Sequence, residues 1–235
     1  MTQTQTPSTL HPSGVNHLAI STCDMKAQLE YWTDVLGCPL KALYWMHGVE
    51  GAIHGFVELS ADSYVAFVQH PDNSDAIEYG VTHAGSAGGP VTGGAMQHVA
   101  LHVDTMDELL AMRDRIRSRG VQVAGPIDHG MVCSIYFGGP EGLSLEVACG
   151  SAIPAEQWVD PEVTELCAID PDELAAMLTP APFDRPDAPV AQPAFADDRH
   201  SMFPAEQWER TMAVPDDVLW KHASETVPPV PPASD

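Results

Sequence analysis

The stretch QHVALHV at residues 97–103 decides the fold of this 235-residue chain, because it repeats NHLAIST at residues 16–22. In both stretches a histidine, His17 or His98, opens an alternating run of apolar residues that predicts a β-strand. Alternation puts each histidine on the strand face of a small residue, Ala19 or Ala100, and opposite the larger aliphatic side chains. A similar order of elements follows both strands, which indicates an internal duplication.

After its first strand, the sequence of each copy predicts one helix and three further strands. In the first copy, Asp24 caps a helix over 25–36 that ends at Gly37, and strands follow at 40–46, 53–59 and 63–69. In the second copy, Thr105 and Glu108 form a capping box for a helix that ends at Gly120. Its strands lie at 96–103, 121–127, 132–139 and 143–149. We therefore expect an α+β fold with two βαβββ modules.

The modules set the domain boundaries. They span 14–70 and 95–150, and a Gly-rich linker joins them at 71–94. A flexible leader is expected at 1–13. From 151 to 235 we expect a Pro-rich tail with short helices that packs on the domain. The pentamer PAEQW occurs twice in this tail, at 154–158 and at 204–208, and the tryptophan of each copy is expected to be buried.

Composition excludes several functions. The chain carries 33 acidic and 10 basic residues, a formal net charge of −23, so neither nucleic acid nor an anionic membrane is an expected partner. No apolar run approaches the roughly 20 residues that span a bilayer, and the first residues do not form a secretory signal. The five cysteines include no CxxC pair, which is typical of reduced thiols and favours a cytoplasmic location.

Glu146, within LSLEVAC, is a carboxylate in the middle of a predicted strand, where desolvation is costly unless the group is paired or binds a metal. Two imidazoles and a carboxylate on sheet faces are the ligands of a facial metal triad. A histidine on a strand can also be an ordinary core residue with satisfied hydrogen bonds, so both interpretations stay open at this point.

The repeated βαβββ unit with its histidines and glutamate resembles the vicinal oxygen chelate superfamily, which includes glyoxalases, fosfomycin-resistance proteins and extradiol dioxygenases. The resemblance covers residues 14–150. It implies a cupped mixed sheet around a divalent metal held by His17, His98 and Glu146. The fourth possible ligand position falls near Phe67 or Gln69, and neither is a carboxylate.

The stretch IDHGMVCSIYFGGPEGLSLE at 127–146 resembles the extradiol dioxygenase signature. The residues that match it are His129, Ile135, Tyr136, Pro140, Gly142 and Glu146, and Gly139 departs from it. The resemblance implies Fe(II), alternatively Mn(II) or another divalent metal, with a small aromatic substrate and O2. It also implies catalytic roles for Tyr136 and His129.

Other features leave alternatives open. Ser63 stands where those dioxygenases carry an acid–base histidine, and His54 or His83 could replace it; His54 is expected to contact substrate. Most such enzymes have four modules rather than two. A metal-dependent isomerase, epimerase or lyase and a metal-free protein that sequesters a small aromatic ligand are the alternative functions. A homodimer is the expected assembly.

Overall fold

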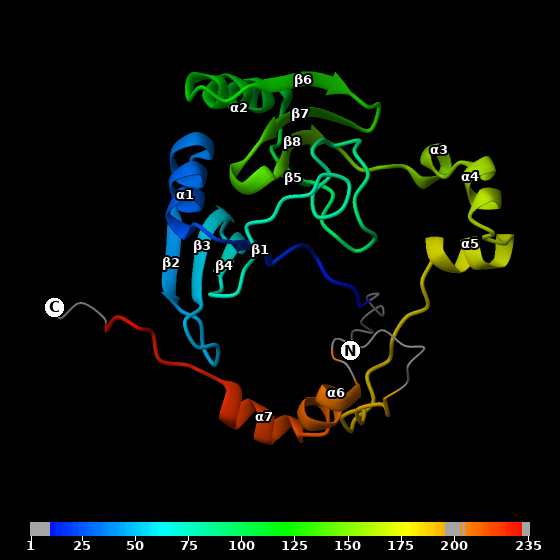
Figure 1. Cartoon of the computed structure of the whole chain (residues 1–235). Helices are drawn as coiled ribbons and strands as arrows, with labels where there is room; N and C mark the ends of the chain where they lie inside the picture. The colour runs from blue at the N-terminus through cyan, green and yellow to red at the C-terminus, as the bar shows by residue number, and fades with distance from the viewer. Residues whose placement is uncertain (1–9, 196–202, 204, 232–235) are drawn as a thin grey trace, which may run out of the picture. The chain divides into compact units, whose positions relative to one another are not determined.

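The chain folds into two four-stranded sheets of the same topology, as the computed structural model shows for residues 10–195, 203 and 205–231 (Figure 1). The sheets have the strand orders β1-β4-β3-β2 and β5-β8-β7-β6. In each, the first strand of the module pairs in parallel with the last, and the other pairs are antiparallel. The predicted α+β fold of two βαβββ modules is confirmed. The strands are β1 (His17–Thr22), β2 (Leu40–Trp45), β3 (Ile53–Ser60), β4 (Ser63–Gln69), β5 (Val99–His102), β6 (Val123–Asp128), β7 (Val132–Gly138) and β8 (Ser144–Gly150).

The first helical segment begins and ends where the sequence predicts. The Asp24 side chain accepts a hydrogen bond from the backbone N–H of Ala27, and Gly37 ends the segment with a left-handed φ of 83°. The predicted single helix is wrong in one respect, because α1 (Met25–Glu30) continues as a wider π-helical segment, η1 (Tyr31–Leu36). Near this junction the Thr33 hydroxyl donates to the backbone carbonyls of Leu29 and Glu30. Such bonds compete with the backbone hydrogen bonds of the helix and often bend it.

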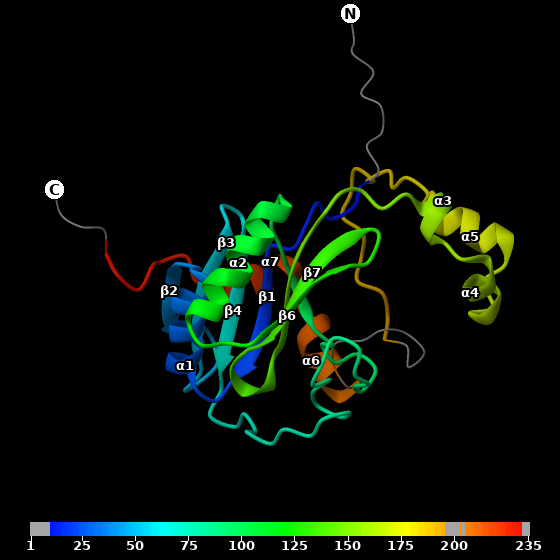
Figure 2. The same ribbon diagram turned by 90° about the horizontal axis from the view of Figure 1, so that it is seen from above.

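The second helix, α2 (Met106–Ser118), has the predicted capping box: Thr105 accepts from the N–H of Glu108, and the Glu108 carboxylate accepts from the N–H of Thr105. Gly120 follows with a left-handed φ of 80°. Figure 2 shows both helices from above. Within the second module, α2 contacts β6, β7 and β8.

The helix-facing sides of both sheets form one apolar core. α1 contacts β3 and β4, and α2 also contacts η1, so the core continues from one module into the other. Its largest fully buried side chains are Trp32, Phe67, Leu109, Ile116, Ile135 and Leu145. Full burial of an aliphatic or phenylalanine side chain contributes about 1.5–3 kcal/mol. The candidate polar residues, such as His17 and Glu146, lie on the faces of the sheets opposite this core.

Glu141 connects the turn before β8 to the first module. It lies in the short 3₁₀ segment η2 (Pro140–Gly142), and its carboxylate accepts hydrogen bonds from the Thr22 hydroxyl at 2.5 Å, the Cys23 amide at 2.6 Å and the Gln28 carboxamide at 2.7 Å. Its φ of 52° is left-handed, which costs a non-glycine residue about 1–2 kcal/mol. One hydrogen bond to a charged group contributes about 1.5–3 kcal/mol, so the three bonds outweigh that cost.

Further polar contacts cross the same module boundary. The Arg115 guanidinium donates to the backbone carbonyls of Val35 at 2.9 Å and Asp34 at 2.8 Å, at the carbonyl end of η1 where a positive charge is favourable. The Tyr31 hydroxyl donates to the Gly138 carbonyl at 2.6 Å. Burial raises the pKa of Tyr31 to about 12, so this hydroxyl remains a donor at neutral pH.

Some predicted boundaries are wrong. The strand expected from residue 96 begins at Val99, because Gln97 just before it directs its side chain to the linker, where it bonds Ser86 and Gly89. The linker at 71–94 is non-periodic as expected, and within the described chain its β-structure is an isolated bridge between Tyr79 and His83.

The tail forms short helices, as predicted: α3 (Ala155–Trp158), α4 (Pro161–Leu166), α5 (Pro171–Leu178), α6 (Ala205–Met212) and α7 (Asp216–Ala223). Residues 12–46 and 51–179 form one compact unit with both sheets, and residues from 180 onward belong to a second. Most of the expected leader lies outside the described residues. None of the described helices is long and apolar enough to cross a membrane.

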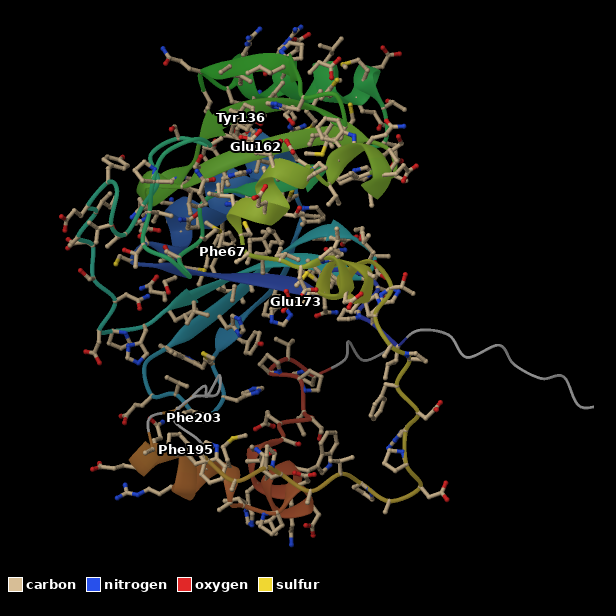
Figure 3. All side chains as sticks on the ribbon, turned by 90° about the vertical axis from the view of Figure 1, so that its right-hand side faces the viewer. Phe67, Tyr136, Glu162, Glu173, Phe195 and Phe203 are labelled. Atoms are coloured by element: carbon tan, nitrogen blue, oxygen red, sulfur yellow. The ribbon has the colours of Figure 1, made fainter. Side chains whose placement is uncertain are left out.

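The predicted burial of the two tail tryptophans is only partly correct. Trp158 is 44% exposed, because α3 is a single turn and the indole is placed against Gly130, where a β-carbon would lie 2.9 Å from the ring. Trp208 is half-buried, with its ring centroid 5.7 Å from that of Phe195, which Figure 3 labels beside α6.

We expect Glu141→Gln to lower the free energy of unfolding by about 1–3 kcal/mol at neutral pH, because the neutral amide cannot accept all three hydrogen bonds. Burial alone would raise the pKa of Glu141, but the bonds from Thr22, Cys23 and Gln28 hold it below its ordinary value of 4.5. The stabilising contribution is therefore fully present above the ordinary pKa and is lost as the pH falls through the lowered one. Urea denaturation of both proteins across this range measures the difference.

The matched control is Glu156→Gln, since Glu156 is exposed on α3. It should leave the free energy of unfolding within about 0.5 kcal/mol of the wild-type value. Equal stabilities of wild type and Glu141→Gln at pH 7 would show that this carboxylate does not hold the modules together.

Candidate functional site

Half-buried His98 and buried Glu146 form a polar pair at the second sheet. Glu146 lies on β8, an inner strand, between Ala100 of β5 and Tyr136 of β7, and it is 4% exposed. The His98 Nε2 atom is 3.0 Å from a carboxylate oxygen of Glu146. The imidazole therefore compensates for the desolvation that a mid-strand carboxylate requires.

The hydrogen bonds of Gln97 define which ring nitrogen of His98 carries a proton. The carboxamide nitrogen of Gln97 donates to the carbonyls of Ser86 at 3.0 Å and Gly89 at 3.1 Å, and the carboxamide oxygen contacts Nδ1 of His98. Because that oxygen can only accept, Nδ1 carries the hydrogen. In the neutral imidazole, Nε2 then directs a lone pair at the Glu146 carboxylate, so two acceptors face each other.

Two arrangements satisfy this geometry. A second proton on the ring makes His98 an imidazolium that donates to Glu146, which is an ion pair. Alternatively, a divalent cation binds both acceptors. Two adjacent ligands at roughly 2.1 Å from an octahedral metal lie about 3.0 Å apart, and imidazole and carboxylate together suit iron or manganese. The observed 3.0 Å separation of Nε2 and Glu146 therefore fits a metal as well as it fits an ion pair.

Tyr136 and His129, both predicted from the signature, lie together. The Tyr136 hydroxyl and the His129 Nε2 atom are hydrogen-bonded at 2.9 Å, and Tyr136 is the direct cross-strand neighbour of Glu146. The ring centroids of Tyr136 and His98 are 6.5 Å apart. Burial raises the pKa of Tyr136 above its ordinary value, and the Glu146 carboxylate adds to this. The hydroxyl therefore keeps its proton at neutral pH and can donate it in a hydrogen bond.

The structure places His17 and His54 on the first sheet, apart from these residues. His17 Nδ1 donates to the Asn16 carboxamide oxygen at 2.9 Å, and the His17 ring centroid lies 5.6 Å from that of Phe56. His54 packs 4.4 Å from the same phenylalanine and is hydrogen-bonded to the Tyr44 hydroxyl at 3.3 Å. In the described part of the chain, no three His, Cys, Asp or Glu side chains form a group that could hold a metal. A site that includes His17 stays a prediction.

The other positions considered as metal ligands or as the acid–base group make hydrogen bonds elsewhere or are buried in the core. The Ser63 hydroxyl donates to the Val15 carbonyl at 2.8 Å, and the Gln69 side chain accepts from the amide of Met25 at 2.8 Å. Phe67 is fully buried in the core, where Figure 3 labels it on the first sheet. His83 contacts the Thr82 hydroxyl at 2.9 Å in the linker.

Two cavities adjoin the polar cluster. One, of about 550 Å³, is lined by His129, Tyr136 and the linker loop at 85–88. The other, of about 800 Å³, is lined by His98 and β5 on one side and by the β3–β4 turn on the other. Both exceed the size of a monocyclic aromatic molecule, and the first combines apolar walls with two polar groups, as small-molecule sites do.

Sequence reasoning missed the roles of Asn16 and Gln97. Each directly precedes a histidine and contacts its Nδ1 atom. The sequence contained an indication of these contacts, because an asparagine or glutamine precedes the histidine in both NHLAIST and QHVALHV. The contact of Gln97 with the linker could not be read from the sequence.

Comparisons with known proteins give a family and several distant relatives. Residues 14–147 match the model of the Glyoxalase/Bleomycin resistance protein/Dioxygenase superfamily. The chain is 35% identical over 52 residues to biphenyl-2,3-diol 1,2-dioxygenase 2 of Rhodococcus globerulus, an alignment that covers 22% of this chain and 27% of that enzyme. The chain thus aligns with only about a quarter of this relative.

Solved structures with the same general arrangement are more distant in sequence. A glyoxylase/bleomycin resistance protein/dioxygenase domain from Frankia sp. EAN1pec has a TM-score of 0.49 and 14% identity, over 60% of this chain and 100% of that one. TnmS3, an antibiotic binding protein from Streptomyces sp. CB03234, has a TM-score of 0.43 and 21% identity, over 60% and 99%. These likenesses carry no conclusion about substrate or metal.

We expect the chain to bind one divalent metal ion, and the variants His98→Ala and Glu146→Gln to weaken binding by more than about a hundredfold, because each removes a direct ligand. His17→Ala tests the third predicted ligand and should have an effect of the same size. Competition titrations with a chelator measure the affinity, with Mn(II) in air or with Fe(II) under anaerobic conditions.

His102→Ala is the matched control. His102 ends β5, the strand that His98 directly precedes; it is exposed and contacts Asp104 at 3.1 Å. Its loss should leave metal affinity unchanged. If all four variants bind Mn(II) as tightly as the wild type, the His98–Glu146 pair is an ion pair only.

Proposed function

The chain belongs to the Glyoxalase/Bleomycin resistance protein/Dioxygenase superfamily, and from this premise we propose that it is a metal-dependent, extradiol-type dioxygenase that cleaves a catecholic ring with O2. The observation that carries the proposal is the polar cluster on one face of the second sheet. It combines a histidine–carboxylate pair with a hydrogen-bonded tyrosine and histidine beside a cavity.

Two sequence observations support this choice within the superfamily. Residues 127–146 resemble the extradiol signature, and the two polar residues of that signature, His129 and Tyr136, contact each other. The relative from Rhodococcus globerulus is a dioxygenase of a biphenyl diol, although the alignment covers only part of it.

His98 and Glu146, with His17 as the proposed third ligand, would hold the metal, for which we propose Fe(II), with Mn(II) as the alternative. When bound, such an ion supplies positive charge that stabilises a catecholate and a place where substrate and O2 meet.

The side chains around the metal position supply the rest of the chemistry. Tyr136 keeps its proton at neutral pH and would donate a hydrogen bond to a substrate oxygen. His129, at 2.9 Å, would orient the Tyr136 hydroxyl by donating its Nε2 hydrogen to the phenol oxygen, which leaves the hydroxyl hydrogen for the substrate. The apolar walls of the 550 Å³ cavity would hold the aromatic ring and exclude water from it.

One observation favours a second candidate, a metal-free protein that sequesters a small aromatic ligand. His98 and Glu146 satisfy each other at 3.0 Å as an ion pair without a metal. The first sheet also presents an aromatic face for stacking, with Tyr44 and Phe56 parallel at 6.3 Å and Tyr64 at 6.4 Å from Phe56. Such a protein would bind catechols without oxygen uptake.

Tyr136→Phe separates these candidates. It removes one hydroxyl from a strand aromatic, so the variant should fold and bind metal as the wild type does. In a dioxygenase, the loss of one hydrogen bond to the transition state should reduce catechol turnover about tenfold to a thousandfold. Affinity for catechol under anaerobic conditions should change far less. Oxygen uptake and anaerobic titration measure the two effects.

Tyr64→Phe is the control, because the Tyr64 hydroxyl donates to the Ala61 carbonyl at 3.1 Å on the other sheet. It should leave turnover unchanged. The proposed function is wrong if the iron-loaded wild-type protein consumes no oxygen with any of a panel of mono- and bicyclic catechols.

A further inference from the structure

The linker loop at residues 85–89 is held to the second sheet by one side chain. Gln97 donates both hydrogens of its carboxamide to this loop, one to the Ser86 carbonyl and one to the Gly89 carbonyl. Within the described chain, these are the hydrogen bonds that tie 85–89 to residues outside the linker. The loop closes on itself through a bond of 3.0 Å from the Gly89 amide to the Ser86 carbonyl.

The shape of the loop is fixed by Gly89. A β-carbon there would lie 2.1 Å from the carbonyl oxygen of Ala84, a distance that no side chain tolerates. This compact form of the loop therefore requires glycine at position 89, and in it the Ser86 and Gly89 carbonyls both face the same carboxamide. Its other side lines the cavity that contains Tyr136 and His129.

The same carboxamide also orients His98. With both hydrogens engaged by carbonyls, Gln97 has only its oxygen left for Nδ1, so a flipped amide would break all three contacts at once. We propose that Gln97 is a positioning residue that couples the 85–89 loop to His98, so that the wall of the substrate cavity and the Nε2 atom of His98, which faces Glu146, are positioned together. The coupling itself is independent of any metal, and only its effect on metal and substrate rests on the proposed function.

The first module offers a natural comparison. Asn16 contacts Nδ1 of His17 at 2.9 Å, as Gln97 contacts His98, but its carboxamide nitrogen donates to no described loop. A shorter, exposed side chain can orient its histidine but does not reach a linker. The coupling is thus a property of the second module.

Two variants of Gln97 separate its two contacts. Gln97→Glu keeps an acceptor for Nδ1 and removes both donors to the loop. Gln97→Met has a similar length and removes both contacts. Asn16→Leu is the control in the first module. The metal-free proteins are compared at about pH 8 by ¹⁵N chemical shifts of the histidine ring nitrogens and by amide hydrogen exchange of residues 85–89.

We expect Nδ1 of wild-type His98 to carry a proton, whether or not Nε2 is protonated as well. Gln97→Glu should keep this proton and raise exchange in the loop at least about tenfold, since the opening free energy of a loop falls when its hydrogen bonds are removed. Gln97→Met should also raise exchange and give mixed tautomers, and Asn16→Leu should change neither quantity. The proposal is overturned if Gln97→Glu leaves loop exchange at the wild-type rate, or if Gln97→Met leaves the ¹⁵N shifts of His98 unchanged.

A second measurement addresses the consequence for the site. Gln97→Met should weaken Mn(II) binding about 10–100-fold, as loss of an orienting partner does, whereas Gln97→Glu should retain it. For an active enzyme, Gln97→Glu should raise KM for catechol with a smaller change in kcat. If the wild type binds no metal, the proposed function fails, while the tautomer and exchange results still decide the coupling.

Discussion

The carboxylate of Glu141 makes three hydrogen bonds across the boundary between the two modules, beside the shared apolar core and the Arg115 and Tyr31 contacts. It lies in the turn between β7 and β8, and all three of its hydrogen-bond donors come from the first module. The same turn leads directly into β8, which carries Glu146 five residues later. Because the backbone of Glu141 is held in a left-handed conformation by these bonds, the start of β8 is fixed relative to β1. The anchor of the module pair and the candidate site thus share one short segment.

The two modules have the same topology but different exposed sheet faces. The face of the first sheet carries the aromatic rings of Tyr44, Phe56 and Tyr64 around His17 and His54. The face of the second carries ionisable groups in mutual contact. After a duplication both faces were free to change, because the core lies on the other side of each sheet. The ionisable groups that contact one another are therefore on the second sheet, whereas the first sheet presents mainly aromatic rings.

The alternation of apolar and polar residues predicted the strands and the strand face on which a side chain lies. A two-residue period places His98 on the face of Ala100, and the strand register of the structure brings it together with Glu146 and Tyr136. The same pattern gives no information on the angle between two separate sheets, so the distance from His17 to Glu146 could not be predicted. Gly-rich linkers have no periodic hydrophobic pattern, so the contact of Gln97 with Ser86 and Gly89 could not be predicted either. The burial of Trp158 was overestimated because a single helical turn covers little surface.

Stability alone gives little reason for a carboxylate at position 146. A buried ion pair contributes little net stability, because desolvation of both charges offsets their attraction, and an apolar residue of similar volume is often as good or better. The neighbouring strand positions Leu145 and Val147 show that β8 readily buries aliphatic side chains. With a neutral imidazole, His98 and Glu146 instead place two acceptors 3.0 Å apart, with Gln97 on the far side of the ring and a protonated tyrosine next to the carboxylate. This arrangement is costly for a core and well suited to holding a cation against a substrate oxygen, which is why we favour a metal enzyme over a binding protein.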